Sequence, residues 1–269
     1  MKLGFIGTGT ITKAVVTGLC TSSEPPQQIL VSPRNWKHAN NLKNEFTQIT
    51  IATDNQEIVN DCDLIVLAIR PQIAHQVLAS LHFRSDQKII SFIATLGIEN
   101  LINLIKPASK IIQAVPLPTV AECLGPIAVY PPDVEVTKLM SKVGSVIEVE
   151  SNDVFLALWS VTALMAPYFA FLATTTDWLI KQGTNKPDAS KYISEMFSGL
   201  STLSVTSKTH NFHSLVSEHQ TTGGLNEQAL QELYQEDWYL KIDKTLDRIL
   251  SRLEGNYTYR PKDIQKKLY

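Results

Sequence analysis

A glycine-rich turn directly after the first apolar run constrains the fold of this chain more than any other feature. The apolar run Leu3–Ile6 leads into Gly7-Thr8-Gly9-Thr10-Ile11-Thr12, and a helix-like segment over residues 14–19 follows. A strand, a glycine turn and a helix in this order form the phosphate-binding turn of dinucleotide-binding folds. Thr12 occupies the place of the third glycine of that pattern, so a glycine turn without a ligand remains the alternative. The expected cofactor-binding residues of the turn are Gly7, Thr8, Gly9, Thr10 and Ile11.

The first 150 residues alternate short apolar runs with polar or amphipathic stretches. Runs rich in Val and Ile are typical of buried parallel strands, and their alternation with helices predicts a doubly wound α/β sheet of the Rossmann type. The runs are Leu3–Ile6, Ile29–Val31, Ile49–Ala52, Leu64–Ile69, Ile89–Ile93, Ile111–Val115 and Ile127–Tyr130.

Helical periods replace this pattern past Asn152. We therefore expect two domains, a Rossmann domain over residues 1–150 that binds NADP and an all-helical domain over residues 151–269 for dimerisation and substrate binding.

Two segments of the second half carry the helical spacing most clearly. Apolar residues recur at i, i+3 and i+4 over residues 187–207, which open with Pro187, and again over residues 225–253. Gly255 stands where the C-cap of the second helix is expected. The remaining tail, residues 256–269, has no strong period and is expected to form a peripheral arm.

Charge and cysteine content exclude several classes of function. The 269 residues include 24 Lys and Arg against 26 Asp and Glu, whereas a nucleic-acid groove needs a basic face. The three cysteines form no paired motif, and His210 and His213 have no nearby cysteine or carboxylate to complete a metal site. Since the first residues also lack the apolar core of a signal peptide, we expect a cytoplasmic protein without a bound metal.

One uncharged stretch needs a separate explanation. No charged residue occurs between Asp153 and Asp177, and the segment is mostly apolar up to Ala173. This length could span a bilayer, but its flanks are acidic and several polar residues interrupt it. A helix that is apolar on all sides is otherwise buried on all sides. The helical half is too small to bury this helix alone, so we expect a second copy of the chain to cover it.

The loop after the second apolar run indicates which cofactor is used. An acidic residue there would bind the ribose of NAD, but the chain has Ser32-Pro33-Arg34-Asn35. The side chains of Ser32, Arg34 and Asn35 can all donate to the 2′-phosphate of NADP, which an acid would repel. We therefore expect NADP(H) in preference to NAD(H), with Arg34 as a solvated loop charge as the alternative.

Two further strand ends are expected to contact the cofactor. Asn55 follows the third apolar run, and Ala68-Ile69-Arg70-Pro71 closes the fourth. Open α/β sheets bind their ligands at the carboxyl ends of the strands. Asn55 could instead cap a helix, and Pro71 could simply begin one.

In order and spacing, these motifs resemble the pyrroline-5-carboxylate reductase family. The family's L-A-V-K-P-Q motif reads Leu67-Ala68-Ile69-Arg70-Pro71-Gln72 here. The resemblance implies a Rossmann domain that binds NAD(P)H, a helical domain that interlocks with a second subunit, and a nicotinamide held between them. Ala94 is a further cofactor contact by the same resemblance. The similarity covers most of residues 1–253 and rests on segments 7–14, 32–35, 54–55, 67–72, 91–97 and 222–224.

The substrate-binding half departs from that family. The M-P-N-T-P loop reads Val115-Pro116-Leu117-Pro118-Thr119, so an amide and a hydroxyl are lost. The S-P-G-G-x-T loop, which helps hold the substrate carboxylate and ring, reads Thr221-Thr222-Gly223-Gly224-Leu225-Asn226. These changes indicate a different or larger imine, or a carboxylate held differently. By this resemblance the catalytic residues are Thr222 and Asn226, and the substrate-binding residues are Val115, Pro116, Thr221, Thr222, Gly223, Gly224 and Asn226.

Reduction of a cyclic imine needs mainly the positioning of the protonated imine against the nicotinamide, so few ionisable residues are required. His219 could supply a proton, although a loop histidine is more often solvated. We predict an NAD(P)H-dependent reductase of pyrroline-5-carboxylate or a related imine, acting in proline biosynthesis as a homodimer or a larger assembly. One alternative is a β-hydroxyacid dehydrogenase, disfavoured because no lysine occurs between Val154 and Ile180. The other is a non-catalytic NADP-binding or regulatory protein.

Overall fold

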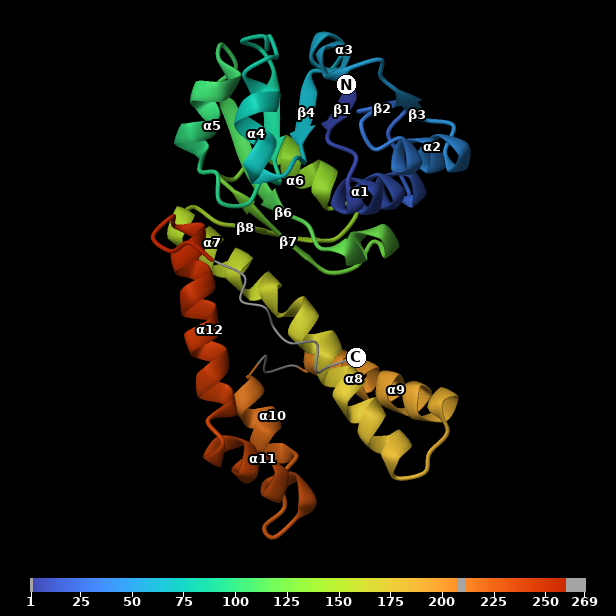
Figure 1. Ribbon diagram of the computed structural model, residues 1–269, viewed down its shortest axis with the longest axis vertical. Helices are drawn as coiled ribbons and strands as arrows, with labels where there is room; N and C mark the ends of the chain where they lie inside the picture. The colour runs from blue at the N-terminus through green and yellow to red at the C-terminus, as the bar shows by residue number, and fades with distance from the viewer. Residues whose placement is uncertain (1, 208–210, 260–269) are drawn as a thin grey trace. The chain divides into compact units, whose positions relative to one another are not determined.

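The computed structural model describes residues 2–207 and 211–259 (Figure 1). The chain forms two compact units, the described parts of Met1–Ser160 with Leu250–Tyr269 and the described parts of Val161–Ile249. A domain boundary near residue 151 stays a prediction.

In the described residues, the first unit contains one sheet of eight strands in the order β3-β2-β1-β4-β5-β6-β7-β8. Strands β1 to β6 pair in parallel. Each of the seven apolar runs of the sequence overlaps one strand, and the expected Rossmann-type sheet is confirmed. The strands are β1 (Leu3–Ile6), β2 (Ile29–Val31), β3 (Ile49–Ile51), β4 (Leu64–Leu67), β5 (Lys88–Ser91), β6 (Lys110–Val115), β7 (Pro126–Tyr130) and β8 (Ser145–Glu148).

Helices cover both faces of this sheet (Figure 1). Helices α1, α2 and α6 pack on one face and α3, α4 and α5 on the other, each through buried apolar side chains such as Val15 and Leu78. Burial on both faces explains why the strands read as unbroken apolar runs. The bounds are α1 (Thr10–Thr21), α2 (Trp36–Glu45), α3 (Asn55–Asp61), α4 (Pro71–Leu78), α5 (Ile98–Ile105), the 3₁₀ helix η1 (Pro118–Glu122), α6 (Val134–Met140) and α7 (Asn152–Val161).

The far end of the sheet differs from the expected all-parallel arrangement. Strand β7 runs antiparallel to β6, and β8 is parallel to β7. Only residues 116–125 connect β6 to β7, which is too short for the crossover that a parallel neighbour needs. The sequence pattern missed β8 because its side chains are mostly exposed and form no apolar run.

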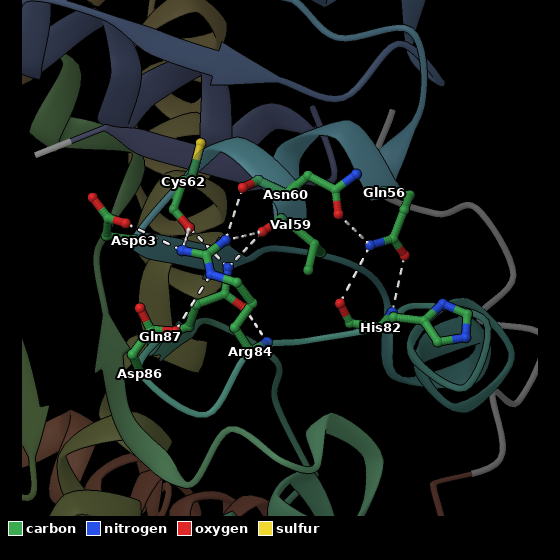
Figure 2. Close-up of polar contacts among 9 residues, drawn as sticks. All are labelled: Gln56, Val59, Asn60, Cys62, Asp63, His82, Arg84, Asp86 and Gln87. Carbon is green, nitrogen blue, oxygen red and sulfur yellow. Dashed lines mark hydrogen bonds and ion pairs between the residues drawn. The ribbon is translucent and has the colours of Figure 1, made fainter.

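The carboxyl end of α3 is closed by side chains from the loop before β5 (Figure 2). The guanidinium Nη1 of Arg84 donates to the carbonyls of Val59 and Asn60, both at 2.8 Å. The buried amide Nε2 of Gln87 donates to the carbonyls of Val59 and Cys62 at 2.6 and 2.8 Å. These bonds satisfy carbonyls that a helix end leaves without intrahelical partners.

From Val161 onward, the regular structure of the described residues is all helical, as expected. Helix α9 begins beside Pro187, but the long period over residues 225–253 is divided into two helices. Asp237 lies between them with φ +56°, a left-handed conformation that ends the first helix. Gly255 has φ +83°, as the expected C-cap role requires. The remaining bounds are η2 (Thr162–Leu164), α8 (Met165–Lys181), α9 (Lys186–Thr206), α10 (Phe212–Glu218), α11 (Leu225–Gln235) and α12 (Trp238–Leu253).

The helical unit has little core of its own. Among its described residues only Ala189 and Ile193 are buried. The continuous helical stretch Asn152–Lys181 is long and apolar enough to cross a membrane by length and composition alone. Large apolar side chains are exposed on the helices of this unit, among them Tyr168, Phe169, Trp178, Tyr192, Met196, Leu200, Leu203 and Val205. Apolar surface of this extent is typical of a face that another protein chain covers.

Candidate functional site

The turn after β1 contains two glycines with different requirements. Gly7 has φ +101°, and a Cβ added to it would lie 2.5 Å from the backbone oxygen of Ala68. The fold itself therefore requires glycine at this position. Gly9 is the N-cap of α1, with φ −85° and ψ −170°, and an added Cβ would meet no atom within 4 Å. The described chain gives no steric reason for glycine at position 9, so its missing side chain leaves open space in front of the helix.

Buried hydroxyl groups fix the shape of this turn. The backbone N–H of Gly7 donates to Oγ of Ser32 at 2.9 Å, and Oγ1 of Thr8 donates to the Ser32 carbonyl at 2.6 Å. Oγ1 of Thr12 donates to the Gly7 carbonyl at 2.6 Å. Thr12, which replaces the third glycine of the motif, is thus a buried brace between helix and turn.

An open hollow of about 380 Å³ lies in front of the turn. No side chain caps α1, and the first turn of α1 has no acidic residue, so its unpaired N–H groups and positive dipole end face an anion-binding position. None of the residues that line the hollow in the described chain is acidic, whereas two are arginines. The lining residues are Gly7, Thr8, Gly9, Arg34, Asn35, Trp36, Ala68, Ile69, Arg70 and Ile73.

The structure brings most of the expected cofactor residues to this hollow. Thr10 and Ile11 form the first turn of α1 beside it. Ser32 is placed differently from the expectation, because its side chain is buried at 1% exposure and bonded to the turn. Trp36, which is 63% exposed at the start of α2, lines the hollow without having been among the expected residues. Its position directly after the loop that contains Arg34 is the sequence signal that could have identified it.

The other expected cofactor residues do not line the hollow. Asn55 is the first residue of α3, and its neighbour Asp54 is the N-cap, whose Oδ1 accepts from the Glu57 N–H at 2.9 Å. The cap alternative considered for Asn55 is therefore wrong by one residue. Pro71 begins α4, as the alternative for that residue stated, and Ala94 follows β5.

A second hollow of about 240 Å³ begins one residue after Ala94, also within the first unit. Thr95 enters it with φ +61°, an unusual conformation for a β-branched residue. Gln113 is 2% exposed, and in the described chain its Oε1 has no hydrogen-bond partner. No sequence pattern indicates this hollow, because its walls come from segments that are far apart in the chain. They are Thr95, Leu96, Gly97, Asn100, Gln113, Asn152, Leu156, Trp159, Leu253, Glu254 and Gly255.

The expected substrate residues fall in different units. Val115 and Pro116 are buried at the end of β6 in the first unit, whereas residues 221–226 form the loop before and the first turn of α11 in the second. Thr222 is exposed there. The structure thus assembles residues 221–226 into one loop.

Three donors of the 221–226 loop have partners within the chain. The N–H of Gly223 donates to Oε2 of Glu227 at 2.7 Å, and the N–H of Gly224 donates to the Thr221 carbonyl at 2.7 Å. Nδ2 of Asn226 donates to the His219 carbonyl at 3.0 Å. Glu227 was not among the expected site residues, although an acid three residues after the N-cap of a helix is a known capping signal.

The expected roles of the histidines can be followed only for those that the structure describes. Nδ1 of His219 lies 2.8 Å from the Leu215 carbonyl and is engaged within its own helix end. In the described residues no group of three His, Cys, Asp or Glu side chains is placed to hold a metal. His210 lies outside the described residues.

Comparison with known proteins identifies relatives of both halves. A family model described as NADP oxidoreductase, coenzyme F420-dependent, matches residues 2–95, and one described as pyrroline-5-carboxylate reductase dimerisation matches residues 153–255. A pyrroline-5-carboxylate reductase of Vibrio alginolyticus is 24% identical over 268 residues, which cover 94% of this chain and 96% of that relative.

Two solved structures share the fold over nearly the whole chain. The reductase of the same name from Streptococcus pyogenes superposes with a TM-score of 0.82 at 20% identity, covering 95% of this chain and 98% of that one. The pyrroline carboxylate reductase of Plasmodium falciparum, solved with NADP bound, gives 0.83 at 18% identity, with 96% and 98% coverage. At these identities the likeness establishes the fold.

Proposed function

This chain belongs to the pyrroline-5-carboxylate reductase family of NAD(P)-dependent reductases, and from that premise we propose that it reduces a cyclic imine with NADPH. Pyrroline-5-carboxylate or a related imine is the substrate, and the product is the corresponding cyclic amine. With pyrroline-5-carboxylate the reaction would be the last step to proline.

The observation that carries this proposal is the open space in front of Gly9. A glycine that neither its φ angle nor its neighbours require is best explained by the close approach of a ligand to the backbone. The uncapped N-terminus of α1 offers N–H groups to a pyrophosphate at that position. When bound, NADPH supplies the hydride, and the residues of the turn hold the dinucleotide in place.

NADP is the favoured form of the cofactor. Arg34 and Arg70 both line the hollow in front of the turn, and none of its lining residues in the described chain is acidic. A guanidinium can pair with a 2′-phosphate in two parallel hydrogen bonds. Because the Ser32 side chain is bonded to the turn, Arg34 and Asn35 carry the contact to the 2′-phosphate in this proposal.

The helical unit is proposed to pair with a second copy of the chain in the cytoplasm. The family model for pyrroline-5-carboxylate reductase dimerisation matches residues 153–255. The helices of this segment expose large apolar side chains, which contact with a second chain would bury. The apolar stretch Asn152–Lys181 then forms the core of a dimer rather than a membrane span. Light scattering is expected to give at least the mass of a dimer.

Steady-state oxidation of NADPH with a panel of cyclic imines tests the proposed function. Imine-dependent oxidation supports it, and a faster reaction with NADP and a β-hydroxyacid would favour the dehydrogenase alternative. Tight binding of NADPH with no turnover of any imine would contradict the proposal and favour a non-catalytic NADP-binding protein. The internal hydrogen bonds of the 221–226 loop are the observation that keeps this second candidate in view.

A further inference from the structure

In the loop before α11, the N–H groups of both glycines are engaged within the chain. In the proposed reaction this loop receives the substrate, and the N–H groups of Gly223 and Gly224, with Thr221, Thr222 and Asn226, are expected to orient its carboxylate. Both glycine N–H groups are already engaged, that of Gly223 by the carboxylate of Glu227 at 2.7 Å and that of Gly224 by the Thr221 carbonyl at 2.7 Å. Glu227 therefore occupies, with its own carboxylate, the position that a substrate carboxylate would take.

The charge around the loop acts in the same direction. A hollow of about 390 Å³ adjoins the two glycines, and in the described chain its walls include two carboxylates, three amides and no basic residue. The walls are Gly223, Gly224, Glu227, Gln228, Gln231, Glu232 and Gln235. An arriving carboxylate would have to displace Glu227 and would then lie beside like charges, which is unfavourable.

A different element shows an independent loss of polar contacts. The segment after β6 is also expected to contact the substrate, and it presents Leu117 and Pro118 where the family has an amide and a hydroxyl. Neither side chain can donate to a carboxylate. Leu117 and Pro118 thus add no side-chain donor from the first segment, and the glycine N–H groups of the second are engaged.

We propose that Glu227 determines the substrate class of this reductase by excluding imines that carry a carboxylate. This inference rests on the proposed function and narrows it to cyclic imines without an acidic substituent, of which pyrroline is the simplest probe. The protonated imine accepts a hydride at carbon, the C=N π pair becomes the nitrogen lone pair, and NADPH is oxidised to NADP⁺. A cationic imine meets no like charge at this loop, whereas a carboxylated one does.

The test compares kcat/KM for pyrroline and for pyrroline-5-carboxylate, with NADPH, in the wild type and in three variants. The wild type is expected to prefer pyrroline by at least about tenfold, the scale of discrimination that one unfavourable polar contact gives. Glu227→Ala is expected to shift the ratio toward the carboxylate by about tenfold or more, and Glu227→Gln, which removes only the charge, by a smaller factor. Glu236→Gln, an exposed acid at the other end of α11, is the matched control and is expected to keep the wild-type ratio.

The outcomes separate this inference from the function on which it rests. A wild type that prefers pyrroline-5-carboxylate would overturn the role of Glu227 while supporting the imine reductase. Unchanged ratios in both Glu227 variants would do the same. If neither imine is reduced although NADPH binds, the proposed function fails and the inference fails with it. A ratio of rates is used because a general loosening of the loop would lower both rates together.

Discussion

Replacing Gly9 with alanine should separate cofactor binding from folding. The backbone at Gly9 has φ −85° and ψ −170°, which alanine adopts without strain, and the added Cβ would meet no atom of the chain within 4 Å. Alanine lowers the conformational entropy of the unfolded chain, which stabilises the folded variant, but it is a weaker N-cap than glycine, which partly offsets that gain. The free energy of unfolding should therefore change by less than about 1 kcal/mol.

The effect of Gly9→Ala on NADPH binding should be much larger. The new methyl group would occupy the space where a pyrophosphate approaches the N–H groups of α1. Loss of two hydrogen bonds to a charged group costs about 3–6 kcal/mol. This corresponds to a dissociation constant that rises by roughly two to four powers of ten. Calorimetric titration with NADPH and urea unfolding of the same samples measure the two quantities.

Gly7→Ala is the matched control, since it adds the same methyl group two residues earlier. There φ is +101° and the Cβ would lie 2.5 Å from the Ala68 carbonyl oxygen. The free energy of unfolding should therefore fall by about 2–4 kcal/mol. A Gly9→Ala variant whose dissociation constant for NADPH stays within a factor of about three of the wild-type value would contradict a pyrophosphate in front of Gly9. A loss of stability as large as that of Gly7→Ala would contradict it too.

Three other perturbations have definite expected outcomes. Arg34→Ala should weaken the binding of NADPH by about 1.5–3 kcal/mol and the binding of NADH hardly at all. Equal losses of affinity for both cofactors in titrations would contradict the assignment of Arg34 to the 2′-phosphate. Gln87→Leu should lower the free energy of unfolding by about 2–4 kcal/mol, because Gln87 makes three short hydrogen bonds in a buried site, and a urea midpoint near that of the wild type would contradict this. Burial raises the pKa of Cys20 and Cys62 to about 11, so at neutral pH a thiol reagent should label only the exposed Cys123 quickly. Labelling of the buried pair should accelerate as the pH rises toward that value, and three equally fast thiols would show that the core is open.

The elements that depend on local sequence could be predicted, because their causes lie within a few residues. The strand runs, the glycine turn and the start of α9 all follow from apolar period, glycine and proline. The antiparallel β7 could be inferred only from the length of its connection, which the apolar pattern does not show. The break at Asp237 was hidden because the apolar period continues across it.

In the candidate site, too, features with local causes could be predicted from the sequence, whereas features that depend on distant segments could not. Sequence placed the glycines, Arg34 and Arg70 together because parallel strands end at one edge of the sheet. It could not show that the Ser32 hydroxyl lies beneath the turn, because that depends on how β1 and β2 are paired. Nor could it show that the N–H of Gly223 is engaged, since spacing alone does not tell which acceptor the closed loop brings within 2.7 Å.

Transfer of deuterium from labelled NADPH would show whether this chain moves a hydride from the nicotinamide to an imine. The purified protein is incubated with pyrroline and NADPH that carries deuterium at the reactive nicotinamide carbon, on either face in separate samples, and the product amine is weighed by mass spectrometry. We expect one deuterium in the amine with one of the two labels and none with the other. Unlabelled amine from both samples, or no amine in protein that binds NADPH, would contradict hydride transfer to an imine by this chain.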